Sequence, residues 1–348
     1  MAKKNKATKK SGKIIFNKII FKWKTKQLKL FFYWMNERQK IYEAKKAGKP
    51  WPWTDDKILQ TYKFTNVFRQ LDRVTEEWTK RYVTLLGSGK ESERWGALSD
   101  GDLLFHCAMF RLFNWPETYD ALHFGMTSWN VDKAISLLSK RRDEEHEQIF
   151  TGAYIIPQGG STDPKIDVIC RALDFLHDGR TKKEKEEGKL PNRVLFANKI
   201  RRRPSMERAV NILMRVPTIG GFIGYEIACD LRHTRLLADA FDVKSWANPG
   251  PGAMRGIHRL MTGKAKLPKG TKRPDYVRAM RMLLRRAERK GMLGKAIKRC
   301  EWPFEMREIE HSLCEFDKYC RVKFKEGKRP RSVYRPPQPK QQDLFDDE

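Results

Sequence analysis

Hydrophobic residues recur at helical spacing along most of the chain, and almost no segment shows the strict alternation of a half-buried strand. The pattern predicts a helix from Phe31 to about Gly48 and another that Thr54 caps, with Asp55 and Asp56 at its positive end. The apolar face of this second helix runs from Ile58 to Leu71, and Arg73 lies near its end. Further helices are predicted at 99–113, 128–138, 164–177, 205–214, from about 222, at 274–298 and at 306–319, with Ser99 and Ser128 as the caps of the first two.

Two other segments depart from this spacing. Residues 154–157 indicate a short extended piece, and the strongly charged residues 180–203 indicate a surface loop or an exposed helix. Neither changes the fold class. The sequence therefore predicts a mainly α protein.

The centre of the chain, residues 204–260, predicts a helix, a hairpin and a second helix. Ser205 can cap the first helix, Pro217 and Gly220-Gly221 force a tight turn, and the next helix starts at about Phe222. Such a hairpin points backbone N–H groups outward, where a nucleic-acid phosphate can accept them, although an ordinary turn gives the same pattern. The residues expected to contact the DNA backbone are Thr218, Gly220 and Gly221.

A second loop with a bare backbone follows at Pro249-Gly250-Pro251-Gly252, and it opens onto a helix with Arg255 in its first turn. A helix N-terminus, glycines that allow close approach and one guanidinium together form an anion pocket. The presence of two such loops in one basic chain favours phosphate binding over two ordinary turns.

Composition points in the same direction. The 348 residues suffice for one large or two modest domains, and 72 Lys and Arg against 43 Asp and Glu leave a net charge of +29. A surplus of this size favours a nucleic-acid partner, and no stretch approaches the apolar length of a membrane span. The six cysteines contain no C-x-x-C pair, so we expect reduced thiols in a cytoplasmic protein with neither a metal site nor a required cofactor.

Three regions are expected along the chain. Residues 1–29 carry many lysines and no acidic residue, which indicates a basic arm on a duplex or a membrane surface, or a solubilising tail. Residues 30–325 form the helical domain, in one piece or as lobes at about 30–200 and 201–325. Residues 326–348 form a proline-rich tail whose end resembles the peptide that docks bacterial replication proteins onto the sliding clamp. The residues that carry this clamp-binding resemblance are Gln341, Asp343, Leu344 and Phe345.

Charged residues on predicted helices supply candidate chemistry. On one predicted helix His311 shares a face with Glu315, and Glu310 shares a face with Cys314. An imidazole or a carboxylate there can act as general base, and a solvated charged face is the alternative. Arg69 and Arg73, one turn apart, suit a phosphate clamp or salt bridges to nearby carboxylates. Arg111 stands in an apolar helix, where its charge must be paired or face a site.

Motifs of several enzyme classes are absent. Gly87-Ser-Gly-Lys90-Glu91 lacks the first glycine of a P-loop at the required spacing, and Glu91 stands where Ser or Thr would hold magnesium. The sequence contains no H-E-x-x-H, G-x-S-x-G or Rossmann fingerprint. A kinase that acts through a Walker motif is therefore not expected.

Several strings across residues 30–325 resemble the phage and fungal alpha-glutamyl/putrescinyl thymine pyrophosphorylases and the helical domain of 5-hydroxymethyluracil DNA kinase. The most specific are Pro249-Gly-Pro-Gly-Ala253-x-Arg255-Gly256 and Ile309-Glu-His-Ser-Leu-Cys-Glu315. Others are Glu37-Arg38, Pro52-Trp53-Thr54-x-Asp56, Tyr62-x-Phe64-Thr65-Asn66-Val67-Phe68-Arg69 and Phe110-Arg111-Leu112-Phe113-Asn114. The resemblance implies a fold related to helix-hairpin-helix DNA glycosylases. It also implies thymidine hypermodification, in which an amine displaces pyrophosphate from 5-pyrophosphoryloxymethyluracil in double-stranded DNA.

This chemistry assigns expected roles to the residues. The target base must be flipped into an aromatic pocket, the departing pyrophosphate needs positive charge and backbone N–H groups, and the amine must lose a proton. The co-substrate amine is an amino acid such as glycine or serine, or a polyamine, in the cytoplasm of a bacterial host if a phage encodes the chain. Expected catalytic residues are Asp72, Glu310, His311 and Glu315; expected substrate contacts are Tyr62, Phe64, Asn66, Arg69, Arg111, Asn114, Tyr225, Gly250, Gly252 and Arg255.

Departures from the glycosylase pattern leave two alternatives open. Where lyase-type glycosylases place a Schiff-base lysine, this chain has Ile223, so β-lyase activity is not expected. Asp239 or Asp242 lies about where a monofunctional glycosylase keeps its aspartate, so excision of a modified pyrimidine is one alternative. A DNA-binding accessory subunit of a kinase or replisome is the other.

Overall fold

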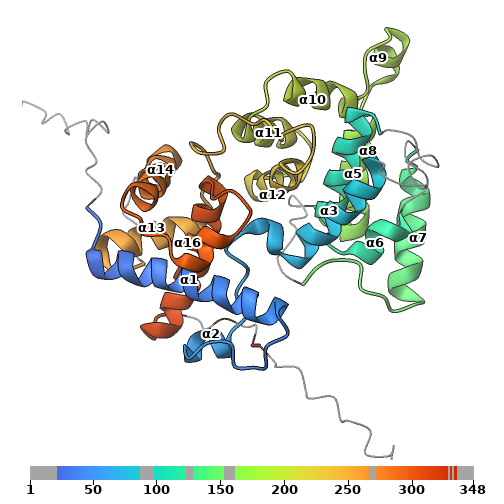
Figure 1. The fold of residues 1–348 in the computed structure, drawn as a ribbon. Helices are drawn as coiled ribbons and strands as arrows, with labels where there is room; N and C mark the ends of the chain where they lie inside the picture. The colour runs from blue at the N-terminus through green and yellow to red at the C-terminus, as the bar shows by residue number, and fades with distance from the viewer. Residues whose placement is uncertain are drawn as a thin grey trace, which may run out of the picture.

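The computed structural model describes residues 22–86, 98–122, 128–152, 161–265, 272–327, 330 and 333–334 (Figure 1). Within these ranges the secondary structure is helical, and an isolated antiparallel bridge between Tyr62 and Val333 is the only strand-like pairing. The predicted mainly α class is confirmed. Most of the basic arm, the predicted extended piece at 154–157 and the clamp-like residues Gln341, Asp343, Leu344 and Phe345 lie outside the described residues.

The helices are α1 Thr25–Lys46, α2 Lys57–Thr61, the 3-10 turn η2 Arg69–Leu71, α3 Arg73–Leu86, α5 Asp100–Phe113, α6 Pro116–Ala121, α7 Val131–Asp143, α8 Lys165–His177, α9 Lys182–Glu186, α10 Asn192–Arg201, α11 Met206–Leu213, α12 Gly221–Leu231, α13 Pro251–Thr262, α14 Arg273–Arg289, α15 Lys295–Arg299 and α16 Met306–Lys323.

Side-chain caps explain where several of these helices begin. Ser99 and Ser205 cap α5 and α11 as the sequence predicted. The cap of α2 is Asp56, which accepts hydrogen bonds from the N–H groups of Ile58 and Leu59, rather than the predicted Thr54. The prediction was wrong for α7. Its cap is Asn130, which accepts from the N–H of Lys133, rather than Ser128.

The helices form two groups that meet along α16, η2 and α12 (Figure 1). One group joins the two ends of the described chain: α1 and α2 pack with α13, α14, α15 and α16. The other group is continuous in sequence and runs from α3 to α12, with α5 buried along nearly its whole length. This grouping differs from a division at about residue 200, because helices distant in sequence bury their apolar faces against each other.

Two glycines allow α13 and α16 to pack closely. A Cβ at Gly256 would lie 2.9 Å from the carbonyl carbon of Leu313, and one at Gly252 would lie 3.2 Å from the Cβ of Cys314. Real Cβ atoms essentially never come within 3.0 Å of another heavy atom, so Gly256 requires glycine for helix packing, and the backbone-side contact at Gly252 would be tighter than almost all real ones. Gly252 was predicted to let an anion approach the backbone; the structure instead gives it a place in the helix interface.

The segment 62–72 does not continue the helix that its apolar spacing predicted. α2 ends at Thr61, residues 62–68 are extended or bent, and η2 is a single turn. Polar side chains stabilise this path in place of helical hydrogen bonds: Asp72 accepts from the N–H of Asn66 at 3.0 Å, and Arg38 donates to the carbonyl oxygen of Phe64. Consequently Arg69 and Arg73 share no helix face, and the predicted clamp between them is wrong.

Candidate functional site

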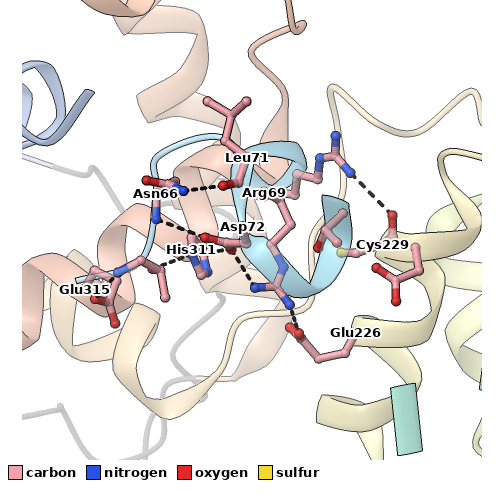
Figure 2. A network of polar contacts seen from close by, with 12 residues as sticks. Asn66, Arg69, Leu71, Asp72, Glu226, Cys229, His311 and Glu315 are labelled. Atoms are coloured by element: carbon pink, nitrogen blue, oxygen red, sulfur yellow. Dashed lines mark hydrogen bonds and ion pairs between the residues drawn. The ribbon is translucent and has the colours of Figure 1, made fainter. Parts of the chain in front are cut away.

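A network of charged side chains lies where the two helical groups meet (Figure 2). Arg69 of η2 donates to Asp72 at 2.9 Å and to Glu226 of α12. Burial opposes the charge of Arg69, but the two carboxylates outweigh it and raise its pKa. The side chains of Arg69, Asp72 and Glu226 keep 12%, 15% and 11% of their surface exposed, so the network is reachable from solvent.

His311 of α16 joins this network. Its Nε2 lies 2.6 Å from the hydroxyl oxygen of Thr65 and 3.8 Å from a carboxylate oxygen of Asp72. Burial lowers the pKa of His311, and the nearby Arg69 lowers it further. The imidazole is therefore neutral at pH 7 and able to accept a proton.

Glu310 lies one residue away and faces the Pro249–Pro251 loop. Its carboxylate accepts a hydrogen bond from the N–H of Gly250 at 3.1 Å. Burial raises the pKa of Glu310 to about 7; the Gly250 N–H works against this rise, and Glu226 adds to it. A carboxylate that is half protonated near neutral pH has the proton affinity that general-base catalysis uses. The Gly250 N–H, predicted to hold pyrophosphate, is engaged by Glu310 instead.

Glu315 has a structural place in the same region, because its carboxylate already has two hydrogen-bond donors. It accepts from the N–H of Thr65 at 3.1 Å and from Lys318 at 2.7 Å. Because Thr65 also contacts His311, Glu315 holds the extended segment 62–66 against α16. The four predicted catalytic residues thus lie in one region, and Glu315 positions the segment 62–66 rather than facing the site.

Arg111 and Asn114 were predicted to bind substrate, and the structure buries both. Arg111 is 2% exposed and donates to the two oxygens of Asp230 at 2.7 and 2.5 Å, while its Nη1 donates to Asn114 at 2.8 Å. Asn114 ends α5 in the left-handed conformation, with φ of 49°. The guanidinium of Arg111 is paired inside the core and lies 3.9 Å from Glu226. Its positive charge therefore stabilises the Glu226 carboxylate from the buried side of the network.

Arg255 and Tyr225 also have other surroundings than predicted. Arg255 lies in the second turn of α13, not in its first, and donates to the buried Asp317 at 2.8 Å. Tyr225 is 4% exposed, packs edge-on against Trp246 and has a buried hydroxyl without a hydrogen-bond partner among the described residues. Burial raises the pKa of Tyr225, and Glu310 contributes to that rise, which places the phenol close to the network rather than in an open base pocket.

The hairpin between α11 and α12 has the predicted position. Thr218 adopts a φ of 68°, unusual for a β-branched residue, and its carbonyl accepts from the N–H of Gly220 at 3.1 Å. The carbonyl of Gly221 accepts from Asn248, which in turn accepts from Arg273 at 2.8 Å. The contact of this hairpin with DNA stays a prediction, and Arg273 adds positive charge beside it.

The predicted aromatic residues divide between two places. Tyr62 and Phe64 line a cleft together with Asn66, whose amide accepts from Arg38 at 2.7 Å, whereas Tyr225 belongs to the charged network. Sequence reasoning did not select Glu226 and Asp230. Their signal was present, since two acids four residues apart stand in the otherwise apolar helix 221–231 and must find partners when buried.

The aspartates considered for a glycosylase have structural surroundings. Asp242 accepts from the hydroxyl of Ser205 at 2.7 Å and from the N–H groups of Met206 and Glu207, so it caps α11. Asp239 is exposed on the surface. Neither carboxylate lies in the charged network, which weighs against base excision through either of them.

Comparison with known proteins identifies the family of this helical chain. A family model described as "5-hmdU DNA kinase, helical domain" matches residues 25–329, a range that includes every helix described above. The chain belongs to this family. The "5-hmdU DNA kinase" of Bacillus phage SP10 is 28% identical over 307 residues, which cover 83% of this chain and 44% of that relative. The chain thus spans less than half the length of the relative, and no solved structure matches it.

Family membership confirms one half of the resemblance seen in the sequence. The helical domain of 5-hydroxymethyluracil DNA kinase is the shared unit, whereas the likeness to pyrophosphorylases and to glycosylases stays a prediction. In the described part of the chain, no helix combines the length and low charge needed to cross a bilayer. Nor does any group of three or more His, Cys, Asp or Glu in those ranges form a metal-binding arrangement.

Proposed function

We propose that this chain is a transferase that modifies thymine bases in DNA. In this proposal an amine displaces pyrophosphate from 5-pyrophosphoryloxymethyluracil in a duplex, in the cytoplasm of a bacterial host. The family membership and the "5-hmdU DNA kinase" of a phage support the substrate class. The missing P-loop supports a step other than phosphoryl transfer from a nucleotide.

One observation carries the proposal: the accessible site is acidic although the chain has a net charge of +29. Asp72, Glu226 and Glu310 gather around the guanidinium of Arg69. The second guanidinium near Glu226, that of Arg111, is already paired with the buried Asp230. Such an excess of carboxylate attracts a cation, and an amino acid or a polyamine enters as an ammonium ion. The arginines predicted to hold pyrophosphate are each paired with a carboxylate, so we assign this site to the amine.

In the proposed reaction, Glu310 takes a proton from the bound ammonium group. The freed nitrogen lone pair attacks the exocyclic methylene carbon of the base, a C–N bond forms, the C–O bond breaks, and pyrophosphate leaves with the electron pair. In this proposal the neutral imidazole of His311, near Asp72, and the phenol of Tyr225, near Glu310, orient the amine. Removal of such a base typically costs a factor of about 10²–10⁴ in rate.

Nucleoside mass spectrometry tests this proposal. The protein is incubated with DNA that contains 5-pyrophosphoryloxymethyluracil and with a mixture of amino acids and polyamines. We expect a thymidine adduct heavier by one amine, lost in Glu310→Gln and kept in Glu301→Gln, an exposed glutamate on the loop before α16. Unchanged nucleosides would favour a DNA-binding accessory subunit, and loss of the base would favour a glycosylase.

The terminal peptide enters as a separate proposal. Gln341, Asp343, Leu344 and Phe345 follow a proline-rich spacer, as a ligand of the sliding clamp would. Docking there would hold the transferase on newly replicated DNA. Co-elution with a purified clamp, lost on Leu344→Ala with Phe345→Ala, is its test.

A further inference from the structure

A large open cleft lies beside the acidic network, and its lining is basic and aromatic. It is bounded by α1, by residues 51–66, by the start of α3 and by residues 333–334, and its volume is about 1380 Å³. Pockets for single small molecules measure roughly 300–1,000 Å³. The cleft therefore has room for more than one nucleotide.

Aromatic rings form one wall of the cleft. Trp51 is 43% exposed, and Trp53 meets Tyr334 edge to face with ring centroids 5.6 Å apart. The ammonium group of Lys45 lies 5.8 Å from the centroids of both of these rings. Unpaired bases stack on exposed aromatic rings, and a nearby ammonium group adds a cation–π contribution. Trp51, Trp53, Tyr334 and Lys45 together offer such a surface.

The floor of the cleft offers a buried donor. Arg38 uses Nε and Nη2 to bind the carbonyl of Phe64 at 3.2 and 3.1 Å, and Nη2 also donates to Asn66. Its Nη1 is buried and has no hydrogen-bond partner among the described residues. A buried guanidinium nitrogen without an acceptor is costly, so a ligand in the cleft that supplies an oxygen would stabilise it.

Positive charge dominates the rim. Lys46, Lys63 and Arg73 are exposed around the opening, and Glu76 is the only acidic side chain that lines it within the described part of the chain. Cations spread along an open groove match the regular spacing of phosphates in a strand. A free nucleotide would need its charges gathered at one point instead.

We propose that this cleft binds a short single-stranded stretch of DNA, whose bases stack on Trp51 and its neighbours while its phosphates meet the rim and Arg38. The inference rests on the proposed action on DNA but not on the transfer chemistry. The extended segment 62–66 separates the two sites: Tyr62, Lys63, Phe64 and Asn66 line the cleft, and Thr65 contacts His311 on the other side. A strand held here runs alongside the acidic site.

Fluorescence anisotropy with a labelled oligodeoxythymidine of about 10 nucleotides, within the usual 4–16 nucleotide site sizes, tests the proposal. Trp51→Ala should weaken binding about tenfold, the loss expected for one stacked base. Lys63→Ala should reduce the slope of log K against log salt by about 0.7, the value for one phosphate of a single strand. The controls are Phe324→Ala and Lys182→Ala, which remove an exposed aromatic ring and an exposed lysine outside the cleft. Both variants should leave the affinity and the salt slope unchanged.

Two results would overturn the proposal. One is wild-type affinity in both Trp51→Ala and Lys63→Ala, which would mean that the strand binds elsewhere on this basic chain. The other is competition by thymidine monophosphate as strong as that by the oligonucleotide, which would make the cleft a site for a free nucleotide. Glu310→Gln should bind the strand normally, so a failure of the transfer reaction and a failure of strand binding are told apart.

Discussion

The carboxylate of Glu310 lies 3.1 Å from the backbone nitrogen of Gly250. This contact joins the two most specific strings of the sequence, one at the start of α13 and one on α16. The glycines of the first string let α13 approach α16, and that approach places the loop over Glu310. Helix packing therefore builds the site.

The pH dependence of transfer should follow Glu310. Its pKa of about 7 means that the basic, deprotonated form appears as pH rises through neutrality. We expect the rate under single-turnover conditions to rise with a midpoint near pH 7 and then level off. Glu310→Gln should be slower by about 10²–10⁴ and should lose that midpoint. A variant that is slow but keeps the wild-type profile would assign the titration to another group.

The same residue should weaken the fold at high pH. Glu310 holds its proton up to about pH 7 in the folded chain, whereas the ordinary value is 4.5. Between these two values the folded chain binds more protons than the unfolded chain, so the free energy of unfolding falls as pH rises, and above pH 7 the loss is complete. At 1.36 kcal/mol per pKa unit the loss is at most about 3 kcal/mol.

Glu310→Gln removes this titration and still accepts from Gly250. We expect the variant to be more stable than the wild type at pH 8 and to gain little at pH 4.5. Urea unfolding at the two pH values measures the difference, with Glu301→Gln as the matched control. An equal gain at both values would show that the effect does not come from the proton of Glu310.

Arg111 should matter for folding more than for substrate. Arg111→Met leaves Asp230, which is fully buried, without its partner, and breaking a buried pair in this way costs about 3–5 kcal/mol. Arg201→Ala removes a pair with Asp100 from a side chain that is 59% exposed, and should change stability by less than about 1 kcal/mol. Chemical denaturation compares the two. Similar small losses would mean that Asp230 finds another partner.

The packing of α13 on α16 gives a further prediction. Gly256→Ala forces a Cβ against the backbone of Leu313 and should destabilise the chain by about 1–3 kcal/mol. Gly220→Ala is the matched control, because a Cβ there meets no atom within 4 Å and its φ is −84°. We expect thermal unfolding to show a lower midpoint for the first variant only. An unchanged midpoint for Gly256→Ala would place the two helices further apart.

Local signals in the sequence were enough for much of the fold. The caps at Ser99 and Ser205, the hairpin after α11 and the face shared by His311 and Glu315 all depend on residues within a few positions of one another. The prediction failed for α2, where apolar spacing continued but Asp72 and Arg38 bind the backbone of residues 64–66. Long-range polar contacts overrode a local pattern there.

Partners distant in sequence explain what was missed in the site. Glu226 and Asp230, which engage Arg69 and Arg111, stand on α12 more than 100 residues away. The spacing along one helix does not reveal which charge of another helix it meets. Arg111 and Arg255 were predicted to bind an anion, but Asp230 and Asp317 neutralise their guanidinium groups. Composition gave the charge of the whole chain but not the acidic character of its site.

The bridge between Tyr62 and Val333 has a consequence for synthesis. The aromatic wall of the cleft joins an early segment, which carries Trp53 and Tyr62, to Val333 and Tyr334, which are made much later. During translation the helices α3 to α12 can pack while the ribosome still holds the rest, since they are continuous in sequence. The cleft is completed only after Tyr334 has emerged, so a nascent chain cannot present this wall to DNA before its helices have been made.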